Sequence, residues 1–147
     1  MQKNFNISII NYKYFSKKYI IYESKRIGKE YEYYNDDIYI FEGEYLNGQR
    51  HGKGKEYNSY KKGDLLFEGE YLYGKRNGKG KEYSELRESK HLIFESEYIN
   101  GKKNGKGKEY DNHESLIFEG KYLNDKEWIG TRYYPSGTLI CINWKMK

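Results

Sequence analysis

The sequence has few of the residues from which most globular cores are built. Only 36% of its 147 residues are hydrophobic; Leu, Ile, Val and Phe are scarce, and tyrosine alone contributes 19 residues. A conventional core between two layers of secondary structure would therefore be thin. Disordered chains also lack aliphatic residues, but they lack aromatic ones too, whereas this chain is 18% aromatic. The composition predicts an ordered sheet on which aromatic side chains pack.

Other absences limit where the protein acts and what it binds. A single cysteine, Cys141, excludes an intrachain disulfide and favours a reducing compartment. The apolar run Ile7 to Ile10 is too short for a secretion signal, and no run approaches the roughly 20 residues of a membrane span. We therefore expect a cytoplasmic protein, either free or peripheral to a membrane or the cytoskeleton. With 27 basic and 22 acidic residues, the net charge of +5 is weak for a dedicated nucleic-acid binder.

What the sequence does contain is a repeat. Residues 41–57 read FEGEYLNGQRHGKGKEY, residues 67–83 read FEGEYLYGKRNGKGKEY, and residues 94–110 read FESEYINGKKNGKGKEY. Self-similarity at a nearly fixed period predicts an array in which each unit packs on its neighbours. Terminal units are expected to be degenerate, because they meet water on one side.

Weaker copies extend the array in both directions. Residues 118–134 open as FEGKYLND, residues 15–31 end in Gly-Lys-Glu-Tyr, and residues 139–144 resemble one more opening strand. The predicted organisation is a lead-in at 1–14, about five repeats over 15–144 and a tail at 145–147. The predicted connectors are 58–66, 84–93 and 111–117, with a helical turn considered at 84–90. Such variable connectors are typical of loops beside a fixed scaffold.

Each unit is predicted to form a β-hairpin. Alternation in Phe41-Glu42-Gly43-Glu44-Tyr45 places the aromatic residues and the glycine on one face and both glutamates on the other. Glycines between Asn47 and Gly52 predict the turn, and Gly54 to Tyr57 forms the return strand. With Tyr45 opposite Gly54, the tyrosine ring would cover the glycine backbone and Glu44 would face Lys55 across the hairpin.

Stacked hairpins predict an all-β fold: an elongated, single-layer, twisted antiparallel sheet of ten to twelve strands. One face would carry stacked tyrosines and glycines, and the other a lattice of Glu and Lys. The structural repeat positions are Phe41, Gly43, Tyr45, Gly48, Gly52, Gly54, Phe67, Gly69, Tyr71, Gly74, Gly78, Gly80, Phe94, Tyr98, Gly101, Gly105, Gly107, Phe118, Gly120 and Tyr122.

The pattern Phe/Tyr-Glu-Gly-Glu-Tyr/Trp-x-Asn-Gly-x-x-x-Gly-x-Gly resembles the MORN (membrane occupation and recognition nexus) repeat. Residues 41–54, 67–80 and 94–107 match it closely, and the weaker copies extend the resemblance to roughly residues 15–144. The resemblance implies hairpins stacked into one elongated antiparallel sheet. The chain departs from the pattern in its longer connectors and at Ser96, where glycine is expected.

The resemblance also implies a set of functions. MORN arrays act as scaffolds and self-associating modules in cytoskeletal and membrane-adjacent proteins, and binding to anionic phospholipids is attributed to some of them. Related hairpin repeats occur in antitoxin-like bacterial proteins. Our first hypothesis is a non-enzymatic scaffold for protein–protein interaction, or for self-association through the aromatic face or an end of the ribbon. A peripheral binder of anionic phospholipids and an antitoxin-like partner protein are the alternatives.

The basic residues of the turns are the best candidates for contact with a partner or an anionic lipid. If the hairpins stack in phase, these residues line up along one edge: Arg50, Lys53, Lys75, Arg76, Lys79, Lys102, Lys103 and Lys106. Such a row could meet lipid headgroups, but solubilising turn lysines that protect strand edges are the favoured interpretation. Tyrosines beside basic residues can stack nucleic-acid bases; at repeat positions they are better explained as the core, so no nucleic-acid partner is expected.

No motif predicts catalysis, a cofactor, a metal or a small-molecule substrate. The segment Gly74 to Lys81 resembles a phosphate-binding loop only superficially, since three residues rather than four precede its Gly-Lys pair and no Ser or Thr follows. His51, His91 and His113 lack the spacing of metal ligands. The paired glutamates Glu42/Glu44, Glu68/Glu70 and Glu95/Glu97 recur identically in the three clear units, which indicates a solvated sheet face rather than an acid–base pair.

Overall fold

The computed structural model describes residues 8–9, 18–32, 38–60, 63–84, 90–136 and 139–143. Of the predicted lead-in, only Ser8 and Ile9 are described, and the predicted tail and most of the segment 84–90 lie outside these ranges. The strands are β1 (Ser8–Ile9), β2 (Lys18–Tyr22), β3 (Ile27–Glu32), β4 (Ile38–Leu46), β5 (Gln49–Tyr57), β6 (Leu65–Leu72), β7 (Lys75–Tyr83), β8 (Leu92–Ile99), β9 (Lys102–Tyr110), β10 (Leu116–Leu123), β11 (Lys126–Tyr133) and β12 (Leu139–Asn143).

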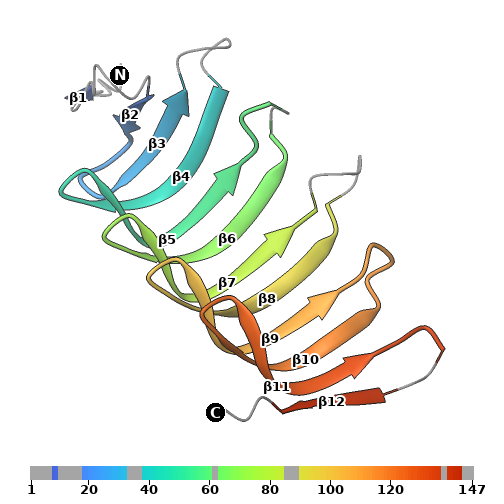
Figure 1. Ribbon diagram of the computed structural model, residues 1–147. Coiled ribbons are helices and arrows are strands. Elements are labelled where there is room, and N and C mark those ends of the chain that lie inside the picture. Colours follow the sequence, from blue (N-terminus) through green and yellow to red (C-terminus); the bar gives the residue numbers. More distant parts are fainter. Residues whose placement is uncertain are drawn as a thin grey trace.

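The strands form one open sheet whose spatial order is the chain order. Each strand pairs antiparallel with its neighbours in sequence, so β1 and β12 lie at opposite ends of the sheet. In Figure 1 the hairpins follow one another along the array and their long strands curve strongly. The predicted all-β, single-layer antiparallel fold is confirmed, and the described residues form 12 strands, within the predicted ten to twelve.

The hairpin turns are shorter than predicted. Asn47 and Gly48 alone connect β4 to β5, with φ angles of 51° and 74°. Two consecutive residues of positive φ make a type I′ turn, whose twist matches that of the paired strands. Tyr73-Gly74, Asn100-Gly101 and Asn124-Asp125 repeat this geometry. The prediction that the turn continues to Gly52 is wrong, because β5 already begins at Gln49.

The predicted cross-strand register is also wrong. Tyr45 lies opposite Arg50 rather than Gly54, and Lys55 faces Glu42 rather than Glu44. The pairs Gly43–Gly54 and Tyr45–Arg50 bound the shift. Between these pairs β5 has more residues than β4, so the register changes there. A bulge at this point absorbs the surplus and bends the strand. The same irregularity recurs in the β6–β7 and β8–β9 hairpins.

The bend folds each hairpin over its aromatic side. The guanidinium Nη1 of Arg50 lies 2.9 Å from Oε1 of Glu56, although six residues of straight strand would separate their Cα atoms by roughly 20 Å. Gly52, with a φ of 61°, lies within this segment. We call the side enclosed by the bend the inner face and the opposite side, which carries Glu42 and Lys55, the outer face.

Aromatic rings fill the inner face. Phe41, Phe67, Phe94, Phe118 and the tyrosines Tyr45, Tyr71, Tyr98 and Tyr122 are all no more than 4% exposed. The rings meet edge to face rather than in the predicted stacks; for example, Phe67 lies 5.6 Å from Tyr71 and 5.4 Å from Tyr98. Because Tyr98 belongs to the next hairpin, the contact joins one repeat to the next. Edge-to-face pairs contribute about 0.5–1.5 kcal/mol beyond area burial.

The glycines beneath the rings leave space for them. A Cβ added at Gly80 would overlap the ring of Phe67 and lie 3.2 Å from Cε2 of Tyr98. Ser96 shows the effect of a real side chain at such a site: it is 6% exposed, and its hydroxyl donates to the carbonyl of Glu97 at 2.9 Å. Opposite Ser96, the nearest atoms to an added Cβ at Gly107 belong to Tyr122 and to Ser96 itself. The serine hydroxyl thus occupies space beside the partner glycine.

We expect Gly80→Ala to lower the free energy of unfolding by about 1–3 kcal/mol, because the new methyl group has to displace the buried ring of Phe67. Denaturant unfolding followed by circular dichroism would measure the loss. In a Phe67→Ala background, where the ring is absent, the same substitution should cost much less. Equal losses in the two backgrounds would contradict this packing.

Candidate functional site

A ladder of ion pairs closes the inner face above the aromatic rings. Arg50 binds Glu30 and Glu56, both at 2.9 Å. Arg76 in turn bridges Glu56 and Glu82. The series continues through Lys103 to Glu82 at 3.0 Å and through Arg132 to Glu109 at 3.7 Å. Each basic residue therefore reaches a glutamate of the preceding hairpin.

The same cations lie over the phenylalanine rings. The Cζ atoms of Arg50 and Arg76 lie 4.3 and 3.9 Å from the centroids of Phe41 and Phe67. The Nζ atom of Lys103 lies 3.3 Å from the centroid of the third ring, Phe94. Cation–π contacts of this kind strengthen as they are desolvated. These side chains therefore form part of the core rather than a basic surface.

The environment of the ladder shifts several pKa values. Burial lowers the pKa of the Arg50 guanidinium, but the charges of Glu30 and Glu56 outweigh burial and raise that pKa above its ordinary value. Burial, followed by the neighbouring Glu56, raises the pKa of the Tyr71 hydroxyl well above its ordinary value. Tyr45, Tyr98 and Tyr122 have pKa values raised in the same way. The inner face thus contains charged cations beside neutral phenols.

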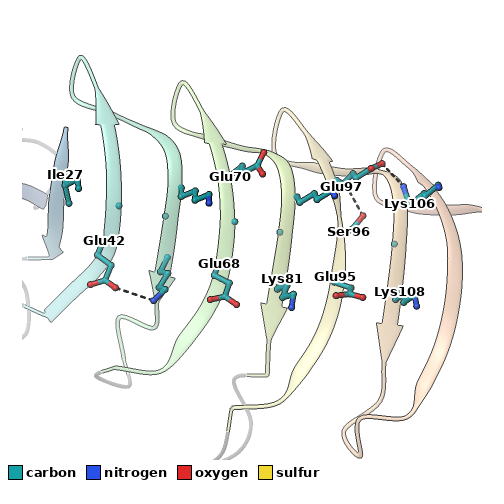
Figure 2. A pocket seen from close by; sticks show the side chains of 18 of the residues that line it. Ile27, Glu42, Glu68, Glu70, Lys81, Glu95, Ser96, Glu97, Lys106 and Lys108 are labelled. Carbon is teal, nitrogen blue, oxygen red and sulfur yellow. Dashed lines mark hydrogen bonds and ion pairs between the residues drawn. The ribbon is translucent and has the colours of Figure 1, made fainter.

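The outer face carries an open groove of about 1220 Å³ that crosses the strands from β3 to β10. Its floor is the backbone of the small residues: Gly28, Gly43, Gly54, Gly69, Gly80, Ser96, Gly107 and Gly120. Charged side chains stand in two rows beside this floor, as Figure 2 shows for Glu68 and Glu70. The groove follows the array because each hairpin contributes the same residues to it.

Charge alternates from strand to strand along the groove. The pairs Glu42 and Glu44, Glu68 and Glu70, and Glu95 and Glu97 lie on β4, β6 and β8. The pairs Lys53 and Lys55, Lys79 and Lys81, and Lys106 and Lys108 lie on β5, β7 and β9. The register places lysine beside glutamate across every one of these strand pairs. The predicted Glu/Lys lattice is therefore present, with a charge repeat of about 9.6 Å from two strand spacings.

The glutamates of the lattice also fix the local backbone. Glu42 accepts a hydrogen bond from the hydroxyl of Tyr57 at 2.8 Å, and Glu44 accepts one from the backbone N–H of Lys53 at 3.0 Å. The second bond spans the bulge. Of the lattice lysines, Lys55 Nζ lies 3.8 Å from Glu42 and Lys108 Nζ lies 3.3 Å from Glu119, whereas Lys53, Lys79 and Lys106 are exposed. Lysine side chains are thus the more available half of the groove.

Comparison with known families agrees with this hairpin geometry. A family model for the MORN repeat matches residues 41–59, 67–85 and 94–113. Three MORN repeats are thus detected between residues 41 and 113. These matches begin at the same residues as the three clear units of the sequence, and no curated protein matches the chain. MORN repeats are in general associated with scaffolds that bind proteins or membranes, and the family is typically a non-enzymatic module.

The MORN hairpins do not place the eight predicted contact residues along one edge. Arg50, Arg76 and Lys103 lie on the inner face, in the ladder over the rings. Lys53, Lys79 and Lys106 are exposed in the row of the groove nearest the turns. Lys75 and Lys102 are exposed beside the turns themselves. The separation follows from strand alternation, since neighbouring residues of one strand point to opposite faces.

Sequence reasoning overlooked the position before each turn of the MORN hairpins. Leu46, Leu72, Ile99 and Leu123 occupy it, and each is 36–51% exposed. The hydrophobic pattern alone suggests core residues. Counting alternation outward from the buried Tyr45 would have placed Leu46 on the outer face.

The described residues show neither a metal centre nor a membrane-spanning helix. Within them, no group of three or more His, Cys, Asp or Glu side chains could hold a metal ion, and there is no helix long and apolar enough to cross a membrane. The ring of His51 meets Tyr73 at 5.6 Å, and Nδ1 of His91 lies 3.1 Å from Glu114. These histidines join neighbouring hairpins and connectors.

Proposed function

We propose that the chain is a non-enzymatic scaffold that binds a partner protein along the outer face of its sheet. The observation that supports this proposal is the different use of the two faces. Phe41, Phe67 and Phe118 are fully buried within the chain, so these repeats leave none of the three rings for self-association through the inner face. The outer face keeps a groove of about 1220 Å³ along the array.

The alternating charge favours a protein over a lipid surface. An anionic membrane attracts only the lysine strands and repels the glutamate strands between them, whereas a protein can present both signs. In addition, Arg50, Arg76 and Lys103 already bind glutamates. The alternative of peripheral phospholipid binding therefore depends on the remaining basic residues, such as Lys75 and Lys102, which are exposed near the turns.

The proposal predicts that partner binding depends on the lysines of the groove. Lys53→Gln, Lys79→Gln and Lys106→Gln together should reduce the yield of a cross-linked partner at least about tenfold, since the three side chains are exposed and the fold does not need them. Cross-linking in cells of the source organism, followed by mass spectrometry, would measure the yield and locate cross-links on the groove. A variant with Lys25→Gln, Arg26→Gln and Lys90→Gln changes three cations outside the groove and serves as the matched control.

Two companion measurements separate the alternatives. Flotation with phosphatidylserine vesicles tests lipid binding, and sedimentation at high concentration tests self-association. Equal partner yields from the groove variant and the wild type, with cross-links outside the outer face, would overturn the proposal. Vesicle binding that the groove substitutions abolish, without any cross-linked protein, would replace it with the lipid function.

A further inference from the structure

Four exposed aliphatic side chains recur at one position of successive hairpins, immediately before each turn. We call them the aliphatic row: Leu46 at 37% exposure, Leu72 at 39%, Ile99 at 51% and Leu123 at 36%. Their cross-strand partners are also exposed: Gln49, Lys75, Lys102 and Lys126. Aliphatic and mainly basic side chains therefore alternate along the turn edge of the outer face.

Packing inside the chain does not account for this row. Tyr45, beside Leu46, faces the core and is 4% exposed, so strand alternation directs Leu46 away from the core. Scattered exposed aliphatic residues are normal on protein surfaces. A series at one repeat position is different, because it sets exposed aliphatic side chains at a regular spacing along one edge, and exposed apolar groups bordered by polar residues mark interaction sites.

The spacing of the row is fixed by hydrogen bonds between the turns. The N–H of Gly74 donates to the carbonyl of Arg50 at 2.8 Å, and the N–H of Gly101 donates to Arg76 at 2.8 Å. The N–H of Asp125 donates to Lys103 at 3.0 Å. Each turn is thereby tied to the preceding hairpin. Successive aliphatic residues are two strands apart, which is about 9.6 Å, and a lysine follows Leu72, Ile99 and Leu123 after about 4.8 Å.

We propose that the aliphatic row binds an acidic amphipathic α-helix of a partner protein, lying along the turn edge and across the strands. This inference rests on the proposed scaffold function and names the kind of partner. Residues seven apart on a helix lie on one face and are about 10.5 Å apart; residues three or four apart are about 4.5–6 Å apart. A helix tilted by roughly 25° matches 9.6 Å, and its intermediate positions then meet the lysines.

Other backbone conformations fit less well. An extended strand advances about 3.3 Å per residue, so residues about 9.6 Å apart would be three positions apart and would point to opposite sides. A polyproline helix repeats every 9.3 Å and matches the aliphatic residues, but its side chains do not recur at half that distance, where the lysines stand. The α-helix is the conformation that matches both spacings.

The basic residues of this edge predict that the helix carries acidic side chains. Lys75, Lys102 and Lys126 lie between or beside the aliphatic residues, and the row itself contains no acidic residue. The nearest carboxylates accept hydrogen bonds from backbone: Asp125, in the last turn, accepts from Lys103 N–H at 2.8 Å, Glu44 from Lys53 N–H at 3.0 Å and Glu97 from Lys106 N–H at 2.9 Å. Glutamate or aspartate on the helix therefore complements this edge.

A designed peptide tests the proposal directly. The probe is a fluorescein-labelled helix of about 28 residues, or four heptads, with leucine once in each heptad, glutamate three and four residues later, and alanine and glutamine elsewhere. Fluorescence anisotropy with the full chain should show binding at least about tenfold tighter than that of a scrambled peptide of equal composition. A version with lysine in place of glutamate should bind more weakly as well.

Two variants assign the binding to the row. Leu72→Ser with Ile99→Ser should weaken binding about tenfold or more, and so should Lys75→Glu with Lys102→Glu. All four side chains are exposed, so thermal melts should stay unchanged and exclude unfolding as the cause. Lys81→Gln with Lys108→Gln, in the groove row remote from the turns, is the control and should bind the peptide like the wild type.

The possible outcomes are distinct. Equal binding of the patterned and scrambled peptides, or binding that ignores the row variants, would overturn the helix proposal. Loss of phosphatidylserine vesicle binding in the row variants, without peptide binding, would assign the row to lipid instead. If the peptide fails while partner cross-linking still depends on Lys53, Lys79 and Lys106, only the helix inference fails. If both fail, the scaffold function fails with it.

Discussion

Raising the pH above about 10 should unfold the protein steeply, because four buried tyrosines resist ionisation in the native sheet. Burial is the first cause that raises the pKa of these phenols, and neighbouring glutamates are the second. In the unfolded chain a tyrosine loses its proton near pH 10. The stabilisation is therefore fully present below the unfolded pKa and is lost as pH rises toward the native one.

The expected size of the effect is large. Each phenol that stays protonated only in the native state contributes a slope of about 1.4 kcal/mol per pH unit. Tyr45, Tyr71, Tyr98 and Tyr122 together give about 5.5 kcal/mol per unit above pH 10. Denaturant unfolding at intervals from about pH 9 to about pH 11 would measure this slope, and tyrosinate absorbance would show when the phenols ionise.

Tyr71→Phe is the matched variant for the alkaline transition. It removes one titrating group and should reduce the slope by about 1.4 kcal/mol per pH unit. Tyr60→Phe, at a position 91% exposed, should leave the slope unchanged. Tyrosinate absorbance that rises to completion near pH 10 while the circular dichroism stays native would refute the assignment.

Phe67→Ala should lower the free energy of unfolding by about 3–5 kcal/mol, a large share of the roughly 5–15 kcal/mol of a typical domain. The side chain is fully buried, and Arg76 lies 3.9 Å from its ring centroid. Its removal leaves a cavity, and it also takes the ring away from Tyr98 in the next hairpin. Equilibrium unfolding in urea measures the loss.

The matched control for Phe67→Ala is Tyr60→Ala. Both substitutions remove an aromatic ring, but Tyr60 is 91% exposed, so its loss should change stability by less than about 0.5 kcal/mol. Phe67→Leu should fall between the two. A loss below about 1 kcal/mol for Phe67→Ala would show that the aromatic rings of the inner face do not hold the hairpins together.

The fold was predictable from the sequence because its information is local and repeated. Alternation in Phe41 to Tyr45 and the Asn47-Gly48 pair specify a hairpin, and the repeat period specifies the stacking. The register was not predictable by the same means. Two glycines, Gly52 and Gly54, lie close together on β5, and the sequence does not show which belongs to the turn and which to a bulge. A bulge adds residues to one strand only, which alternation cannot reveal.

The sequence predicted which basic residues are candidates for contact, but it did not predict which of them lie on the inner face and which on the outer face. Arg50, Lys53 and Lys75 look alike in sequence as basic residues near a turn. In the folded hairpin the bend turns Arg50 onto Phe41, while Lys53 lies in the groove and Lys75 beside the next turn. The pairing of Arg50 with Glu30, twenty residues earlier, is a contact between hairpins. Such contacts become visible only once the bend is known.

The direction of the ion-pair ladder has a consequence for how the chain is made. Arg50 binds Glu30, Arg76 binds Glu56, and Lys103 binds Glu82. In each case the carboxylate belongs to the hairpin that leaves the ribosome first. A newly synthesised hairpin therefore finds its counter-ion already in place, and no earlier hairpin has to wait for a later one to neutralise a buried cation. The array can grow from the amino end one hairpin at a time, each step templated by the last.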